Sequence, residues 1–186
     1  MREAIGNMWD DPAPVKVVTI NLCVKADGAL VMGRGCAAEA ARRWPELPAE
    51  WGRHVHDREY VPTAEGVRTR VCLDESLFPD TARGLIAFPV KAREHTNIPD
   101  GTEGHPGWMC GNRVRSTWCR VEVMRLILAN LRGLVSCARV LRASAVAMPR
   151  LGCGFGGLSW LDVSPWLAAC LDDRFVVYGL PGEASR

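Results

Sequence analysis

The 186-residue sequence lacks several features that would assign it to a broad functional class. It has no apolar run of about 18 residues, so no segment is predicted to span a bilayer as a helix. Its formal net charge is only +2, which gives little electrostatic reason to wrap nucleic acid or coat a membrane, although it allows a local contact to nucleic acid. Residues 1–11 contain no apolar signal-peptide core, so we expect a cytoplasmic protein with no membrane partner.

The cysteines lack the spacing of a metal or redox site. There are eight, with no C-x-x-C pair, and most lie in apolar segments where a thiol behaves as a small hydrophobic side chain. Without an export signal, a disulfide framework is not expected. His54 and His56 are two residues apart, but no third ligand has convincing spacing. The sequence therefore predicts neither a metal site nor a cofactor.

Strand-like and helix-like segments alternate along the chain. Strands are expected at 16–20, 67–73, 85–90, 143–148 and 175–178, after a short opening segment at 5–9. Helices are expected at 35–43, 118–131 and 160–171, with Arg113, Arg115 and Arg120 on the solvated face of the second. This alternation predicts one α/β domain over residues 1–181 with a mixed, mostly parallel sheet, followed by a frayed tail at 182–186.

The most informative stretch is G-C-G-F-G-G-L-S, residues 152–159. An apolar run precedes it and an apolar periodic segment follows it, so it joins a strand to a helix. Such a turn presents backbone N–H groups and a positive helix end to an anion, usually a phosphate. A second turn of this kind lies at 32–35, with the sequence M-G-R-G. Two phosphate-binding turns in one chain favour a diphosphate ligand.

The glycines also have to be compared with other glycine-rich motifs and with ordinary turns. Gly152, Gly154 and Gly157 match G-x-G-x-x-G, but Asp172 and Asp173 precede the last strand, whereas the dinucleotide-binding motif needs an acidic residue after the next strand. No phosphate loop of the G-x-x-x-x-G-K-[ST] type is present. Plain turns account for the glycines at 33 and 35 equally well. The four glycines within 152–157 increase the backbone entropy that is lost on folding. Close approach of a ligand to the backbone is a good reason for the chain to carry them.

Four segments carry recognisable motifs, in the order V-T-I-N at 18–21, V-M-G-R-G-C-A at 31–37, L-I-A-F-P-V-K at 85–91 and M-P-R-L-G-C-G-F-G-G-L-S-W at 148–160. Together they resemble the macro domain family. The chain is most similar to the branch of small ADP-ribose-binding and ADP-ribosyl-hydrolysing proteins. That branch includes the terminal ADP-ribose glycohydrolase and antitoxins that strip ADP-ribose from DNA. The resemblance runs from residue 6 to residue 178, except for 92–112, which looks like a loop insertion.

The resemblance implies a three-layer α/β/α sandwich that holds ADP-ribose across the carboxyl edge of its sheet. It places segment 32–35 on one side of the diphosphate and segment 152–157 on the other, and it places Asn21 and Phe155 near the distal ribose. Asn7 replaces an aspartate that contacts adenine, and its side-chain oxygen can accept the same hydrogen bond. The implied ligand-binding residues are Asn7, Asn21, Met32, Gly33, Arg34, Gly35, Gly152, Cys153, Gly154, Phe155, Gly156 and Gly157.

Lys91 is the catalytic candidate that the resemblance implies, because hydrolases of this branch carry a lysine after the F-P-x strand that acts on the distal ribose. A lysine can attack or polarise an anomeric carbon when its surroundings lower its pKa. Gly156 stands where the terminal glycohydrolase has an aspartate. The expected function is therefore removal of ADP-ribose from DNA, protein or a small molecule. A non-catalytic sensor of ADP-ribose and an ADP-ribose-1″-phosphate phosphatase are the alternatives.

Overall fold

The computed structural model describes residues 1–22, 25, 27–62, 68–70, 77–91, 116–154 and 156–181. They form a six-stranded sheet in the order β1-β8-β7-β2-β6-β5. Its strands are β1 (Arg2–Ile5), β2 (Val15–Asn21), β5 (Phe78–Asp80), β6 (Leu85–Lys91), β7 (Val146–Pro149) and β8 (Phe175–Gly179). Only β5 runs antiparallel to its neighbour. The expected mixed, mostly parallel sheet is confirmed.

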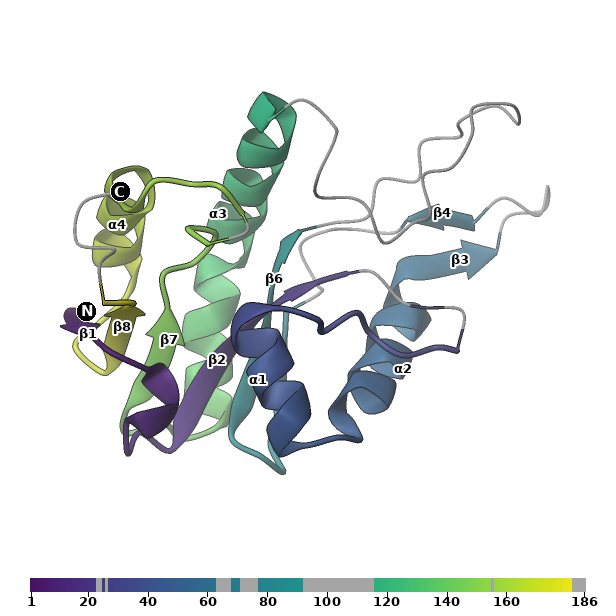
Figure 1. Ribbon diagram of the computed structural model, residues 1–186, viewed down its shortest axis with the longest axis horizontal. Helices are drawn as coiled ribbons and strands as arrows, with labels where there is room; N and C mark the ends of the chain where they lie inside the picture. Colours follow the sequence, from purple (N-terminus) through teal and green to yellow (C-terminus); the bar gives the residue numbers. More distant parts are fainter. Residues whose placement is uncertain are drawn as a thin grey trace.

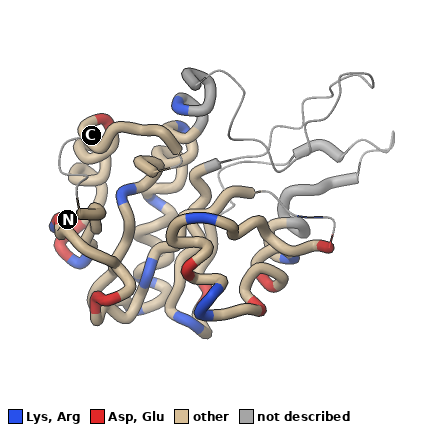
Figure 2. Tube along the Cα trace, in the orientation of Figure 1, with Lys and Arg blue, Asp and Glu red and all other residues tan. Residues whose placement is uncertain are grey.

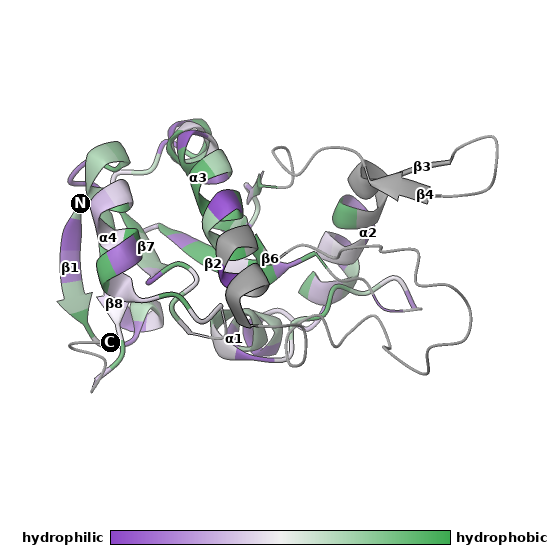
Figure 3. Ribbon diagram, turned by 90° about the horizontal axis from the view of Figure 1, so that it is seen from above, coloured by the Kyte–Doolittle hydropathy of each residue, from purple (hydrophilic) through white to green (hydrophobic). Residues whose placement is uncertain are grey.

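Helices cover both faces of this sheet (Figure 1). On one face lie α1 (Gly35–Arg43) and α2 (Leu47–Glu59), and on the other lie α3 (Ser116–Val140) and α4 (Trp160–Cys170). The view from above shows the sheet between α1 on one side and α3 and α4 on the other (Figure 3). The three-layer α/β/α sandwich that the resemblance implied is therefore confirmed.

Strand β2 contributes side chains to the hydrophobic core on both faces of the sheet. Its side chains alternate between the two faces, as in any strand. Val15 and Val17 pack with α3 and α4, whereas Val18 and Ile20 pack with α1 and α2. All four are at most 2% exposed. Burial of each such side chain contributes about 1.5–3 kcal/mol to stability, which explains why this short β-branched run forms the centre of the sheet.

Helix α2 is absent from the sequence-based expectations. Its buried residues Leu47, Trp51 and Val55 follow one another at intervals of four, which is a helical stripe. Two prolines, at positions 45 and 48, obscure the pattern. Pro48 lies in the first turn of the helix, where a missing backbone N–H costs nothing. The chain therefore forms a second helix, over residues 47–59, shortly after α1 ends.

Strand β5 was also missed, because Pro79 gives it the composition of a turn. It lies at the edge of the sheet and pairs with β6 on one side only, and proline is tolerated in edge strands. The opening strand, Arg2–Ile5, comes earlier than the segment expected at 5–9. Within the stretch expected to be a strand at 67–73, the structure describes β4 (Arg68–Arg70), which pairs with β3 (Tyr60–Pro62) outside the main sheet.

The insertion expected at 92–112 and the tail expected at 182–186 lie outside the described residues. Among the residues that are described, no helix is both long enough and apolar enough to cross a membrane.

Candidate functional site

Five parallel strands end at one edge of the sheet, and most of the residues that the resemblance implies follow these ends. Asn21 ends β2 and Lys91 ends β6, and the two are direct partners in the strand register. The register shifts by one residue just before this pair, so β6 carries an extra residue there. The residue expected to contact the distal ribose and the residue expected to act on it therefore stand opposite each other at the carboxyl edge.

The chain leaves the neighbouring strands β2 and β7 toward opposite faces of the sheet. After β2 it enters α1, whose buried residues pack on one face, and after β7 it enters α4, whose buried residues pack on the other. In open α/β sheets, ligands bind where neighbouring connections diverge in this way, beyond the carboxyl ends of the strands. The edge above β2 and β7 is therefore where this fold is expected to bind a ligand.

The first glycine segment, residues 32–35, leads into α1 at this edge. Met32 is buried in the core, so its backbone rather than its side chain can face a ligand. Helix α1 begins at Gly35 without a side-chain cap, because Arg34 makes no capping hydrogen bond. A Cβ atom on Gly33 or Gly35 would meet no atom within 4 Å. An uncapped helix start beside open space is suited to binding an anion.

Cys36 holds this helix start onto β2. Its Sγ lies 3.0 Å from the Oγ1 atom of Thr19 and accepts a hydrogen bond from the Thr19 N–H at 3.3 Å. Burial raises the pKa of the Cys36 thiol, and the hydrogen bonds to Thr19 offset only part of this effect. The thiol is therefore protonated at neutral pH, and it acts as a packing group rather than as a nucleophile.

The second glycine segment, residues 152–157, connects β7 to α4 and is folded tightly upon itself. The N–H of Gly157 donates to the carbonyl oxygen of Gly154 at 3.0 Å, and the N–H of Leu158 donates to that of Gly152 at 3.1 Å. Ser159 then caps α4, with its Oγ accepting from the N–H of Leu161 at 3.3 Å. Within the described residues no hydrogen bond uses the N–H groups of Gly154 and Gly156. These donors remain available to an anion.

Two glycines of this segment have no room for a side chain. A Cβ on Gly156 would overlap the backbone of Gly152, with its Cα only 2.8 Å away. A Cβ on Gly152 would lie 2.8 Å from Val123 and 2.9 Å from Leu158. Gly154, in contrast, faces open space. The carboxylate that the terminal glycohydrolase carries at the position of Gly156 could not be accommodated by this loop conformation.

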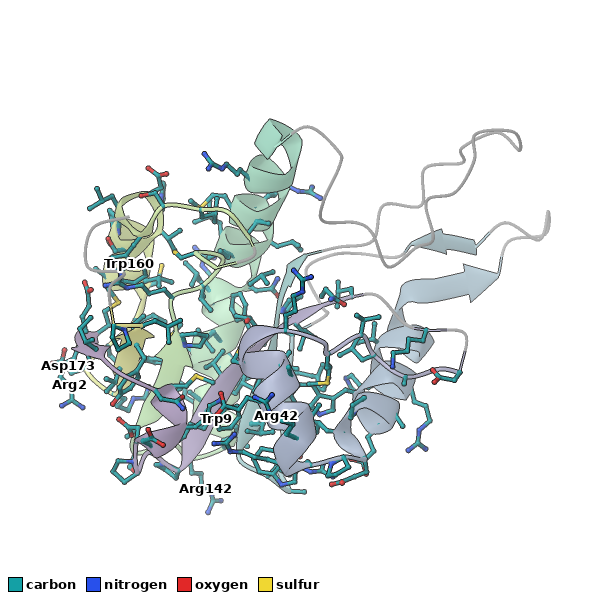
Figure 4. All side chains as sticks on the ribbon, viewed as in Figure 1. Arg2, Trp9, Arg42, Arg142, Trp160 and Asp173 are labelled. Atoms are coloured by element: carbon teal, nitrogen blue, oxygen red, sulfur yellow. The ribbon has the colours of Figure 1, made fainter. Side chains whose placement is uncertain are left out.

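Arg150 anchors the start of the loop. Its side chain is only 9% exposed, its guanidinium lies 4.9 Å from the centre of the Trp160 ring, and its Nη2 lies 3.6 Å from Oε2 of Glu3. The same Glu3 oxygen accepts a hydrogen bond from the indole of Trp160 at 2.9 Å. Figure 4 shows Trp160 at the start of α4. This group of residues joins β1, β7 and α4, and it holds the second glycine segment in place.

Asn7 follows β1 at the same edge, where the N–H of Gly6 donates to the carbonyl oxygen of Gly179 at 2.9 Å. The Asn7 side-chain oxygen accepts from the N–H of Trp9 at 3.1 Å and caps η1 (Met8–Asp10). Its amide nitrogen donates to Glu39 of α1 at 3.4 Å. Asn7 therefore connects the N-terminal turn to α1, and its oxygen keeps one lone pair for a further donor.

The structure therefore puts both glycine segments, Asn7, Asn21 and Lys91 at one edge of the sheet. For Lys91 the backbone alone is described, and Phe155 lies outside the described residues. Within the described part of the chain, no three histidine, cysteine, aspartate or glutamate side chains gather as metal ligands would.

Arg120 is a residue at this edge that the sequence did not single out as part of a site. It is exposed, as expected, but it shares the core-facing side of α3 with Ile127 and Leu134 instead of lying on the solvated face, and its Nε lies 3.7 Å from the point where a Cβ on Gly157 would stand. Figure 2 shows basic residues in the upper part of α3. The spacing of Arg120 from Ile127 and Leu134 is a signal that could have identified it, since residues seven apart share a helix face.

Comparisons with known proteins support the same fold. No family model matches the chain. The curated DNA ADP-ribosyl glycohydrolase of Thermus aquaticus is 27% identical over 172 residues, which cover 92% of this chain. The chain spans only 38% of that relative's length.

Several solved structures are similar over nearly the whole chain. The macrodomain of Mycobacterium tuberculosis DarG has a TM-score of 0.61 at 25% identity over 95% of both chains. The macrodomain of Thermus aquaticus DarG has a TM-score of 0.61 at 23% identity over 97% of both. Thermosipho africanus DarTG, solved in complex with ADP-ribose, has a TM-score of 0.61 at 18% identity, covering all of this chain and 43% of that one. The chain therefore has the macrodomain fold, and the resemblance noted in its sequence is confirmed.

Proposed function

We propose that the chain binds ADP-ribose at the carboxyl edge of its sheet and removes it by hydrolysis from DNA. The observation that carries this proposal is the pairing of Asn21 with Lys91 at the ends of β2 and β6, beside the point where the connections diverge. The curated relative, a DNA ADP-ribosyl glycohydrolase, supports the choice of reaction and substrate.

The two glycine segments bind the diphosphate in this proposal. The uncapped start of α1 and the available N–H groups of Gly154 and Gly156 donate to phosphate oxygens without burying a charged side chain. Asn21 contacts the distal ribose, as the resemblance implies. The sugar is then held at the ends of β2 and β6, next to Lys91.

Lys91 acts on the anomeric carbon of that ribose. In the overall reaction, the bond from this carbon to the DNA breaks, a bond to the oxygen of water forms, and a proton from water passes to the departing group. The segment from Arg150 to Ser159 contains no aspartate or glutamate, and Gly156 leaves no space for one. Proton transfer or nucleophilic attack at this position therefore falls to the lysine.

A pair of lysine substitutions tests this role. Lys91→Ala should leave ADP-ribose binding intact in calorimetry while lowering hydrolysis of an ADP-ribosylated oligonucleotide at least about 100-fold, the usual contribution of an acid–base group. Lys91→Arg keeps the charge but cannot give up its proton at neutral pH. It should be as inactive as the alanine variant if the lysine attacks or transfers a proton, and partly active if it only polarises the sugar.

Absence of heat with wild-type protein and ADP-ribose at high concentration would refute the proposal at its first step. Undiminished turnover by Lys91→Ala would remove the lysine from the mechanism.

The missing loop carboxylate favours a second candidate function, a binding module that senses ADP-ribose without turning it over. Hydrolysis of the modified oligonucleotide by the wild-type protein would exclude this candidate. Release of inorganic phosphate from ADP-ribose-1″-phosphate in the same assay series would instead indicate a phosphatase.

A further inference from the structure

Arg120 occupies a position on α3 where an apolar residue is expected. Residues seven apart lie on the same face of a helix, and Arg120 precedes Ile127 by seven residues and Leu134 by fourteen. Ile127 and Leu134 are 0% exposed and pack in the core beneath α3 and α4. Arg120 shares their face but is exposed. The core-facing stripe of α3 therefore ends, toward the N-terminus of the helix, in a guanidinium group.

The geometry of the layers explains how this guanidinium reaches solvent. Figure 1 shows the upper end of α3 extending past the ends of β6 and β7. At that height the core-facing side of the helix no longer meets the sheet. It meets the second glycine segment, where the Arg120 Nε lies 3.7 Å from the point at which a Cβ on Gly157 would stand.

The charge of Arg120 is not used within the described part of the chain. No hydrogen bond, ion pair or ring contact involves its side chain there. Arg83, by comparison, pairs with Asp80, Glu46 and Glu50, and Arg150 is held between Glu3 and Trp160. Arg120 has no such structural task, although it stands beside a loop whose N–H groups are also available.

We infer that Arg120 contacts a phosphate group of the substrate in the proposed site, an inference that rests on the proposed function. The planar fork of a guanidinium matches two phosphate oxygens, and such charged pairs are stronger than hydrogen bonds between neutral groups. The substrate offers two sources of phosphate, the diphosphate of ADP-ribose and the phosphodiester of the DNA strand. Arg120 stands at the rim of the loop, so it can meet either of them.

The test compares Arg120→Ala with Arg132→Ala. Arg132 is exposed on the same helix, and its side chain makes no ion pair within the described residues, but it lies on the side of α3 away from the core. Two measurements are made on each variant and on the wild type: ADP-ribose binding by calorimetry, and kcat/KM on an ADP-ribosylated oligonucleotide at several salt concentrations. Thermal unfolding checks that both variants are folded.

Arg120→Ala should weaken one or both activities about 10- to 100-fold, as expected for a lost charged hydrogen bond, and should reduce the salt dependence. Arg132→Ala should match the wild type. Weaker ADP-ribose binding assigns Arg120 to the diphosphate, whereas a loss confined to the oligonucleotide assigns it to the strand. If Arg120→Ala had the ADP-ribose affinity and kcat/KM of the wild type, or if Arg132→Ala lost as much, this inference would be overturned while the proposed function would stand. Failure of the wild-type protein to bind ADP-ribose would overturn both it and the proposed function.

Discussion

The two glycine segments at the carboxyl edge have similar sequences, but the surrounding structure constrains them differently. No atom lies within 4 Å of the point where a Cβ on Gly33 would stand, and the backbone of this residue is in a conformation that any residue adopts. Gly152 and Gly156 are enclosed instead, the first by side chains of α3 and of Leu158 and the second by the loop's own backbone. The protein's own packing requires the second pair, whereas nothing in the described structure requires Gly33.

The sequence of a glycine-rich segment therefore does not show why a glycine is needed at each position. The entropic cost of four glycines in 152–157 points to close approach of a ligand when it is judged from the sequence. The structure supplies a packing reason for two of them and leaves Gly154 facing open space. Gly33, in the segment that a plain turn explained equally well, also faces open space, and close approach of a ligand is the reason proposed for it.

Gly156→Ala should have the largest effect on stability. Its Cβ would lie 2.8 Å from Cα of Gly152, and backbone cannot move aside as a flexible side chain can. We expect a loss of about 1–3 kcal/mol in the free energy of unfolding, as for other overpacked sites. Urea denaturation measures it. Gly154→Ala, two residues away in open space, is the control and should change stability by less than about 0.5 kcal/mol. Equal effects at the two positions would contradict the distinction between enclosed and open glycines.

Gly33→Ala, in contrast to Gly156→Ala, should leave the free energy of unfolding unchanged and weaken ligand binding. The added methyl group occupies the space beside the start of α1 where the diphosphate is proposed to lie. Calorimetry with ADP-ribose should show affinity reduced about tenfold or more, which corresponds to at least about 1.4 kcal/mol.

Gly133→Ala is the matched control for this prediction. It makes the same substitution in the middle of α3, away from the carboxyl edge, where the nearest atom to a Cβ is a flexible side-chain carbon of Leu77 at 3.3 Å. It should bind ADP-ribose as the wild type does. Unchanged affinity in Gly33→Ala would mean that the first glycine segment does not approach the ligand.

The sequence was sufficient for the parts of the fold that local patterns determine. Helix α1 has the expected bounds of 35–43, because Pro45 prevents its continuation, and the central strands lie within two or three residues of their expected positions. Helix α2 and strand β5 were missed because prolines in a first helical turn and in an edge strand resemble turns. Whether a proline breaks an element depends on its place in the fold, which local composition does not contain.

The candidate site was likewise predictable from the sequence only in part. The resemblance implied that both glycine segments would lie at the carboxyl edge of the sheet, and they do. The spacing of Arg120 places it on the apolar stripe of α3, but the sequence does not show that this end of α3 extends past the sheet, where the side chain reaches solvent (Figure 1). Likewise, the space around each glycine depends on residues distant in sequence, such as Val123 beside Gly152.

Arg142 is a residue other than glycine at a position where the backbone favours glycine. Its substitution should have the smallest effect of those predicted. Among the described residues it is the one non-glycine with a positive φ, at 50°. It follows the end of α3, where its N–H donates to the carbonyl oxygen of Arg139 and the next N–H donates to that of Ala138, both at 2.9 Å. This is the pattern of a helix end that normally carries glycine. Figure 4 shows the Arg142 side chain pointing away from the molecule, so its removal costs no packing.

Arg142→Gly should therefore stabilise the protein. Relief of the left-handed strain, about 1–2 kcal/mol, exceeds the entropic cost of glycine, about 0.5–1 kcal/mol, so a net gain of about 0.5–1 kcal/mol is expected. Thermal unfolding should shift upward by about 1–4 °C. Arg139→Gly, three residues earlier and still inside α3, should instead destabilise by about 1 kcal/mol. If both substitutions destabilised the protein, the cost of glycine in the unfolded chain would outweigh the backbone strain at this helix end.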